Sequence, residues 1–179
     1  TWDRARGQTT QKTQRYGRTY VFRIFLLRHS EAEALTTEDV LPMKQGKYIQ
    51  QWGEEDVVQV LIAKSKVDQL NMGCIRTKGR VDGVLCPAWA MRNLRKAVPL
   101  ITKKNYRGPL FTSDGIHPMG RQKVQQWLRV GASKVGMPTD RIGTHSLRIG
   151  GATALYNMNR SHGAIMRFGR WKSDSFHGY

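Results

Sequence analysis

The chain has 179 residues, and its 30 Lys and Arg against 13 Asp and Glu give a formal net charge of +17 at pH 7. The length suits one domain with a hydrophobic core, and a hydrophobic content of 39% with 5 Trp, 6 Tyr and 5 Phe excludes a disordered basic tail. Because so large an excess of positive charge repels itself in a compact molecule, it indicates a polyanionic partner, either nucleic acid or an anionic membrane surface.

The same sequence argues against several other classes of protein. The longest apolar run, around Val21–Leu27, is interrupted by Arg23 and is far shorter than the roughly 20 residues of a membrane span. The polar N-terminal residues lack the hydrophobic region of a signal peptide, so we expect a protein that is not secreted. Cys74 and Cys86 form no CxxC pair and the histidines are scattered, so we predict no disulfide framework and no metal site.

The first half of the chain contains one predicted helix and one predicted hairpin. Residues 1–19 are polar and basic without an apolar period, which indicates a tether or a fragment of something longer. Over residues 20–35 the apolar residues recur at helical spacing and predict a helix. The β-branched run VVQVLI at 57–62 and the segment 74–77, separated by a polar stretch, predict a hairpin or small sheet.

The second half is predicted to be helical. Apolar stripes at helical spacing predict helices over residues 87–98 and 118–135. Two further helices are expected, from residue 144 to about 158 and over 160–168. Pro87 suits the first turn of one helix, and Thr144 is a candidate N-cap of another. The sequence therefore predicts an α+β domain that is mainly helical, with one small antiparallel sheet.

The charges are unevenly distributed along the chain. Seven of the 13 acidic residues fall between residues 31 and 56, whereas residues 115–179 hold only Asp140 and Asp174 against ten Lys and Arg. The C-terminal third is therefore the expected polyanion-binding face.

One stretch of this basic third, GTHSLRIGGATAL at 143–155, groups residues that suit phosphate binding. At about 100° per residue on an α-helix, His145 and Arg148 lie on one face, while Leu147, Gly151 and Ala154 lie roughly opposite. We therefore expect one face to pack and the other to present an imidazole and a guanidinium beside the free N–H groups of a helix N-terminus.

Four motifs follow one another along the chain: LRHSEAEAL (27–35) with DV at 39–40, SKVDQ (65–69), HSLR (145–148) with GGAT (150–153), and GRW (169–171) with Tyr179 downstream. In this order they resemble the active-site signature of the tyrosine recombinases, the phage-integrase family. The sequences GGATAL (150–155) and GRWKSD (169–174) are most similar to the corresponding motifs in eukaryotic transposable elements of the tyrosine-recombinase retrotransposon and crypton kind. Val67 stands where the family commonly has Thr, and the resemblance covers residues 26 to 179.

The resemblance implies the fold of the catalytic domain of these DNA breaking-rejoining enzymes and a cofactor-independent transesterification of DNA. It assigns catalytic roles to Arg28, Lys66, His145, Arg148, Trp171 and the nucleophile Tyr179, with Glu31 in a supporting role. The tyrosine oxygen attacks a phosphodiester to form a 3′-phosphotyrosine, and Lys66 protonates the leaving 5′-oxygen. The two arginines grip the charged transition state, His145 handles a proton, and Trp171 donates its indole N–H to a phosphate oxygen.

Other interpretations of these residues stay open. Lys64 and Lys78 are alternatives to Lys66 on the same predicted hairpin, whereas Tyr106 and Tyr156 are ordinary structural tyrosines. The chain can also be a topoisomerase of the related 3′-linked tyrosine type (type IB-like), or a catalytically decayed DNA-binding remnant. An RNA-binding module is disfavoured because the sequence has no RNP-like or KH-like motif.

The resemblance also implies a domain organisation and partners. We expect residues 20–179 to form the catalytic domain, with the family's N-terminal DNA-clamp domain and C-terminal helix missing. We expect double-stranded DNA as the partner, contacted by Arg121, Lys123, Arg170 and Lys172. The expected assembly is a homotetramer on synapsed DNA sites. The expected location is the nucleus for a eukaryotic element and otherwise the cytoplasm with the nucleoid, and no membrane is involved.

Overall fold

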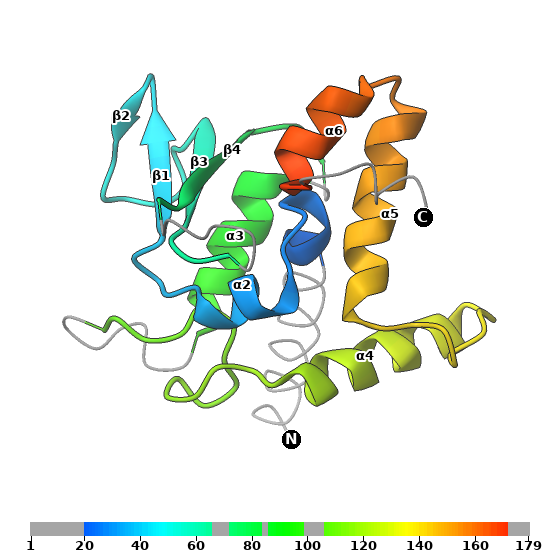
Figure 1. Cartoon of the computed structure of the whole chain (residues 1–179). Helices are drawn as coiled ribbons and strands as arrows, with labels where there is room; N and C mark the ends of the chain where they lie inside the picture. Colours follow the sequence, from blue (N-terminus) through cyan, green and yellow to red (C-terminus); the bar gives the residue numbers. More distant parts are fainter. Residues whose placement is uncertain (1–19, 66–71, 84–85, 99–105, 172–179) are drawn as a thin grey trace.

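The computed structural model describes residues 20–65, 72–83, 86–98 and 106–171. A small antiparallel sheet lies on one side of the molecule and a group of helices lies on the other, with residues 20–35 between them (Figure 1). This arrangement confirms the predicted mainly helical α+β fold with one small sheet. Within the described residues, no helix is both long enough and apolar enough to cross a membrane.

The sheet has four antiparallel strands in the order β2-β1-β3-β4. Their bounds are Val40–Lys44 (β1), Lys47–Tyr48 (β2), Val57–Ile62 (β3) and Cys74–Gly79 (β4). Strands β3 and β4 pair from Val57 opposite Gly79 to Ile62 opposite Cys74, which confirms the predicted hairpin. Alternate residues of β3 face the core, as expected for a sheet that is covered on one side.

Strands β1 and β2 form a hairpin that the sequence analysis did not predict. Gln45 and Gly46 connect the two strands, and both have positive φ angles, 50° and 76°. Two central residues with positive φ are typical of the type I′ turn that joins tight hairpins. A Gln-Gly pair between two short apolar segments was the available signal for this element.

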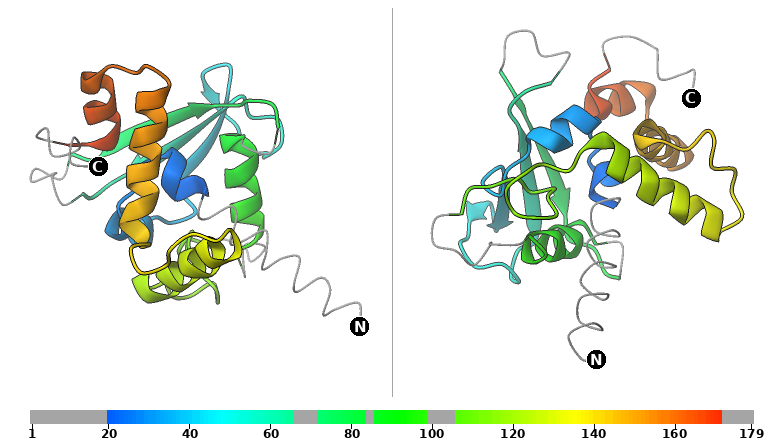
Figure 2. Two further views of the ribbon diagram at one scale, coloured as in Figure 1. Left: turned by 90° about the vertical axis from the view of Figure 1, so that its right-hand side faces the viewer. Right: turned by 90° about the horizontal axis from the view of Figure 1, so that it is seen from below.

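Helix α3 (Pro87–Lys96) packs on β3 and β4 and covers one face of the sheet (Figure 2). Pro87 occupies the first turn, where its missing N–H costs no hydrogen bond, and the Cys86 sulfur accepts a bond from the Trp89 N–H at 3.5 Å. Met91 and Leu94 are buried in the main core, together with side chains from the sheet and from residues 21–35.

The predicted single helix over residues 20–35 is wrong, because the chain breaks into two helices. Residues 20–24 are helical, and α2 (His29–Ala34) begins five residues later. Leu26 lies in the left-handed region with φ 48°, the Leu27 N–H reaches back to the Phe22 carbonyl at 3.0 Å, and the Leu26 N–H reaches back to the Arg23 carbonyl. These bonds form a Schellman motif, a helix ending that usually places glycine where Leu26 stands.

Three helices form the other side of the molecule: α4 (Arg121–Lys134), α5 (Thr144–Asn157) and α6 (His162–Gly169). They confirm the three predicted C-terminal helices with small shifts at their ends. Helix α5 contacts both α4 and α6, and α6 lies near the end of β4 (Figures 1 and 2). Gly151 allows α5 to approach the helix break, because a Cβ at this position would overlap the Leu26 side chain.

Candidate functional site

The site is built around the carboxylate of Glu31, whose side chain is fully buried. Glu31 is the third residue of α2, and one of its oxygens accepts the Arg28 backbone N–H at 2.7 Å, a bond that caps the helix. The other oxygen accepts bonds from the Arg28 guanidinium at 2.9 Å and from the Ser65 hydroxyl at 2.7 Å. The carboxylate therefore joins α2 to the segment that follows β3.

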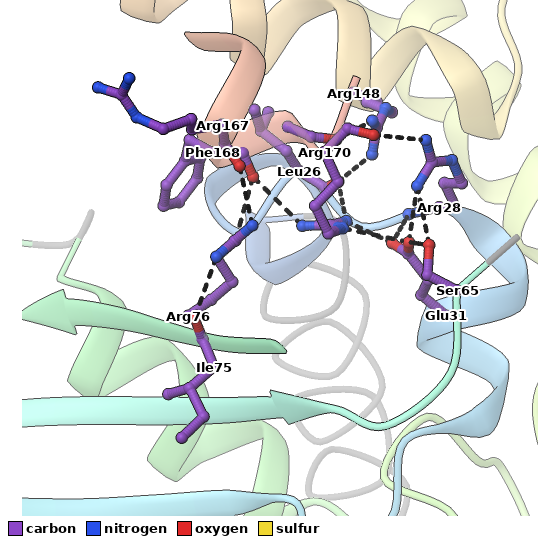
Figure 3. A network of polar contacts seen from close by, with 11 residues as sticks. Leu26, Arg28, Glu31, Ser65, Ile75, Arg76, Arg148, Arg167, Phe168 and Arg170 are labelled. Atoms are coloured by element: carbon purple, nitrogen blue, oxygen red, sulfur yellow. Dashed lines mark hydrogen bonds and ion pairs between the residues drawn. The ribbon is translucent and has the colours of Figure 1, made fainter. Parts of the chain in front are cut away.

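Arg170 brings a third part of the chain to the same carboxylate (Figure 3). Its Nε donates to one Glu31 oxygen at 3.2 Å and its Nη2 donates to the other oxygen. Arg170 follows the last residue of α6 and precedes Trp171, so this ion pair ties the C-terminal end of α6 to α2.

These contacts determine the charge state of Glu31. Burial raises the pKa of its carboxyl, but the charge of Arg170 and the hydrogen bonds from Arg170, Arg28 and Ser65 outweigh burial and lower the pKa to about 2. Glu31 is therefore ionised at pH 7 and neutralises part of the positive charge of the two arginines.

Arg148 lies beside this cluster and is 2% exposed. Its guanidinium donates to the Leu26 carbonyl at 2.6 Å and to the Gly169 carbonyl, and it stacks against the Trp171 ring at 4.1 Å from the ring centre. The helix break thus has a structural consequence, because it turns the Leu26 carbonyl out of the helix and toward Arg148 (Figure 3).

The expected division of α5 into a packing face and a presenting face is wrong for Arg148. The buried residues of α5 are Thr144, Arg148, Gly151 and Ala152, whereas Leu147 and Ala154 are only half-buried. The reason is tertiary: the helix break and the end of α6 both pack on the face that carries Arg148, and their carbonyls satisfy its guanidinium.

His145 lies in the first turn of α5 and is exposed. Partial burial of its ring lowers its pKa, and the charges of Arg148, Arg121 and Arg28 lower the pKa further. The neutral imidazole is therefore favoured at pH 7, which suits a group that accepts a proton or a hydrogen bond. The same charges place His145 within the field of three arginines.

The structure therefore brings Arg28, Glu31, Arg148 and Trp171 together, with His145 nearby. Arg28 remains 22% exposed at its side chain and donates to the Arg170 carbonyl at 3.1 Å, next to the Gly169 carbonyl that Arg148 uses. Two predicted site residues, Lys66 and Tyr179, lie outside the described residues, as does Lys172.

The two alternative lysines of the hairpin are both described. Lys64 is exposed after the end of β3. Lys78 projects from β4 with its ammonium 4.0 Å from the centre of the Phe168 ring, and burial, with the charge of Arg160, lowers its pKa. Ser65, the residue before Lys66, donates to Glu31 and accepts a bond from Arg28 at 3.1 Å. The residue that directly precedes Lys66 is therefore held beside Arg28 and Glu31.

The predicted DNA-contacting residues occupy different environments. Arg121 and Lys123 are exposed in the first turn of α4. The side chain of Arg170 is only 7% exposed, and its donors are used inside the protein. The two tyrosines interpreted as structural also differ: the Tyr106 hydroxyl donates to the Gly115 carbonyl at 2.8 Å, whereas Tyr156 is exposed and stacks on His162.

Arg76 on β4 is a further part of the site that the sequence analysis did not identify. Its guanidinium donates to the Phe168 and Arg167 carbonyls at 3.1 and 2.9 Å, which satisfies the last turn of α6. An isolated Arg in a strand gives no local signal of such a contact. Within the described residues, no group of three or more His, Cys, Asp or Glu side chains could hold a metal ion.

This mixed fold, with its small four-stranded antiparallel sheet, is the fold of tyrosine recombinase catalytic domains. No protein-family model matches the chain, and no curated protein is similar enough in sequence to match it. The known proteins that this chain resembles are therefore found by comparing three-dimensional structures and not by comparing sequences.

Among the solved structures that it resembles are a site-specific recombinase, in two complexes, and a transposon integrase. The XerH recombinase bound to its difH substrate before cleavage matches with a TM-score of 0.66 and 14% identity, over 92% of this chain and 41% of that one. XerH in a post-cleavage complex with palindromic difH gives the same TM-score and identity, over 40% of its length. The Tn1549 transposon integrase bound to circular intermediate DNA matches with a TM-score of 0.55 and 16% identity, over 90% of this chain and 51% of that one. The chain thus spans about half or less of the length of these proteins.

Proposed function

We propose that the chain is the catalytic part of a site-specific DNA recombinase or integrase that cleaves and rejoins DNA through a 3′-phosphotyrosine. The observation that carries the proposal is the convergence of Arg28 and Arg148, which come from distant parts of the sequence. They donate to the adjacent carbonyls of Arg170 and Gly169, with Trp171 stacked on Arg148. Paired guanidiniums beside an imidazole and an indole suit one phosphate group.

In the proposed reaction, the Tyr179 hydroxyl attacks the phosphorus of a DNA phosphodiester. A bond forms between the tyrosine oxygen and phosphorus, and the bond to the 5′-oxygen breaks. His145, neutral at pH 7, takes the tyrosine proton, and Lys66 gives a proton to the leaving 5′-oxygen. The phosphodiester is exchanged for a phosphotyrosine ester of similar energy, so the step is reversible on a second 5′-hydroxyl.

The arginines would stabilise the extra negative charge of the pentacoordinate phosphate. Because the Trp171 ring covers the Arg148 guanidinium, a phosphate reaches Arg148 only when the indole moves aside. The indole N–H can then donate to a phosphate oxygen. Glu31 keeps Arg28 in place and does not react.

Double-stranded DNA is the proposed partner, and a homotetramer on two synapsed sites is the proposed assembly. The +17 charge and the exposed Arg121 and Lys123 support DNA binding. An origin in a eukaryotic transposable element, with action in the nucleus, is proposed from the GGATAL and GRWKSD motifs alone.

Covalent trapping tests the function. The chain is incubated with randomised duplexes that carry a nick in one strand, so that the short cleaved fragment diffuses away and religation fails. We expect an SDS-resistant protein–DNA adduct, which selects the preferred target for later measurements. Tyr179→Phe abolishes the adduct and leaves DNA binding intact, because only the nucleophilic oxygen is lost. Tyr156→Phe, which removes an exposed hydroxyl from α5, is the matched control and keeps the adduct.

The outcomes separate the proposed function from its alternatives. DNA binding without an adduct from the wild-type chain supports the decayed remnant and overturns the enzyme. An adduct accompanied by relaxation of one supercoiled plasmid, without strand transfer between two duplexes, supports the topoisomerase. An adduct that survives in Tyr179→Phe moves the nucleophile to another residue.

A further inference from the structure

Arg170 stands in a backbone conformation that normally favours glycine. Its φ and ψ angles are 59° and 42°, in the left-handed region, directly after the last residue of α6. A non-glycine residue persists in this region where surrounding contacts hold it there. The contacts of the Arg170 side chain are therefore the place to look for what an arginine contributes at this position.

The Arg170 guanidinium holds two acceptors at once. It forms a forked ion pair with both oxygens of the fully buried Glu31 carboxylate, and its Nη2 also donates to the Leu26 carbonyl at 2.9 Å. A planar guanidinium can make such a fork, whereas the single ammonium of a lysine cannot. With its side chain only 7% exposed, Arg170 is committed to the interior of the site.

The same two acceptors hold the two arginines of the proposed phosphate site. Glu31 accepts from Arg28 at 2.9 Å, and the Leu26 carbonyl accepts from Arg148 at 2.6 Å. The Arg170 carbonyl accepts a second bond from Arg28 at 3.1 Å. Arg170 is therefore connected to Arg28 through Glu31 and through its own backbone, and to Arg148 through Leu26 (Figure 3).

We propose that Arg170 is a positioning residue that fixes Arg28 and Arg148 relative to each other. This inference rests on the proposed function, in which both guanidiniums bind one phosphate. It replaces a direct DNA contact of Arg170 with an internal role, because the donors of its guanidinium point at Glu31 and at main-chain carbonyls. The residue acts through the two arginines and does not touch DNA.

The first test measures the rate of adduct formation in Arg170→Gly. Glycine adopts the left-handed conformation without strain, so the variant removes the guanidinium and keeps the backbone path. At saturating DNA we expect the first-order rate to fall by about 100-fold, the loss that a misplacement of roughly 1 Å can cause. Arg170→Lys keeps the charge but not the fork, and it is expected to lose rate as well.

Arg95→Gln is the matched control for this test. It removes one positive charge, the hydrogen bond from Arg95 to the Thr37 carbonyl at 2.9 Å and the contact of Arg95 with the Trp52 ring, on a helix that supplies none of the hydrogen bonds to Glu31 described above. The control corrects for effects of net charge on DNA affinity. We expect its adduct rate to equal that of the wild type, while its DNA affinity falls as far as that of Arg170→Gly.

The second test needs no DNA cleavage. A dicarbonyl reagent that modifies accessible guanidiniums is applied to the folded chain, and each arginine is followed by mass spectrometry. In Arg170→Gly we expect faster modification of Arg28 and Arg148, because their shared acceptors are no longer held. Arg95 reports global loosening, since a merely unfolded variant would expose it equally.

Together, the two tests distinguish a failure of the proposed function from a failure of the inference about Arg170. If the wild-type chain forms no adduct, the proposed function fails, and the labelling of Arg28 and Arg148 alone decides the role of Arg170. Adduct rates of Arg170→Gly and Arg170→Lys equal to that of Arg95→Gln overturn the inference. So does labelling of Arg28 and Arg148 that is unchanged, or that rises only in step with Arg95.

Discussion

A single buried carboxylate, Glu31, organises the charged residues of the site. It accepts bonds from Arg28, Ser65 and Arg170, which come from three separate segments. Breaking such a buried pair by removing one partner is costly, because it leaves an uncompensated charge in the interior. The carboxylate therefore links the charge state of one residue to the stability of the fold.

This link predicts a dependence of stability on pH. The pKa of Glu31 is lowered from 4.5 to about 2 in the folded protein, so the ionised form stabilises the fold above pH 4.5. As the pH falls from 4.5 to about 2, the free energy of unfolding loses a contribution of at most about 3 kcal/mol. Glu31→Gln should be less stable than wild type at pH 7, and the difference should shrink over this window. Urea unfolding of both proteins from pH 7 to pH 2 measures it, and a difference that stays constant with pH would contradict the assignment.

At the scale of elements, the break between residues 24 and 29 positions the site. It turns the Leu26 carbonyl toward α5 and α6, where Arg148 and Arg170 both use it. Helix α5 can come this close because Gly151 has no side chain, and a Cβ there would overlap Leu26. The helix break and Gly151 therefore form one close contact, in which α5 packs directly against Leu26.

Substitution of this glycine tests the contact. Gly151→Ala should lower the free energy of unfolding by about 1–3 kcal/mol, the cost of overpacking a tight core. It should also slow adduct formation, because the Leu26 carbonyl moves. Gly150→Ala is the matched control: it lies in the same helix with nothing within 4 Å of the added methyl group. Because alanine is the better helix former, the control should gain up to about 1 kcal/mol. Denaturant unfolding compares the two, and equal effects would contradict the proposed close approach.

The sequence predicted the elements of the fold better than the breaks within them. Apolar periodicity was sufficient for α3 and α4, and the β-branched run at 57–62 was sufficient for the β3–β4 hairpin, because burial of one face governs those segments. The break at Leu26 was hidden, since leucine takes the left-handed position that glycine would have marked. The role of Arg170 was hidden for another reason: its partner Glu31 is remote in sequence, and only tertiary packing brings the two together. The same packing buries Arg148, which helical geometry alone had placed on an open face.

At the scale of the whole molecule, some positive side chains are paired with acidic residues, whereas others are exposed on a helix that has no acidic residue. Much of the acidic segment 31–56 neutralises nearby cations, as in the ion pairs of Glu38 with Arg107 and of Glu54 with Lys44, at 2.9 and 2.8 Å. Helix α4 contains no acidic residue, and its Arg121, Lys123, Arg129 and Lys134 are exposed. The charge of Arg121 also lowers the pKa of His145, so the basic helix begins close to the proposed phosphate site.

This division predicts where DNA binding depends on salt. Each phosphate contact adds roughly 0.9 to the slope of log affinity against log salt, because counterions are released from the DNA. Arg121→Gln combined with Lys123→Gln should therefore reduce the slope by about 2 and weaken binding to all DNA sequences alike. Lys44→Gln combined with Lys47→Gln removes the same charge from the β1–β2 hairpin and should leave the slope unchanged. Titrations of a labelled duplex at several salt concentrations measure both variants. Equal slopes for the two variants would contradict a DNA contact at α4, because the salt dependence would then follow the net charge of the protein and not the surface of this helix.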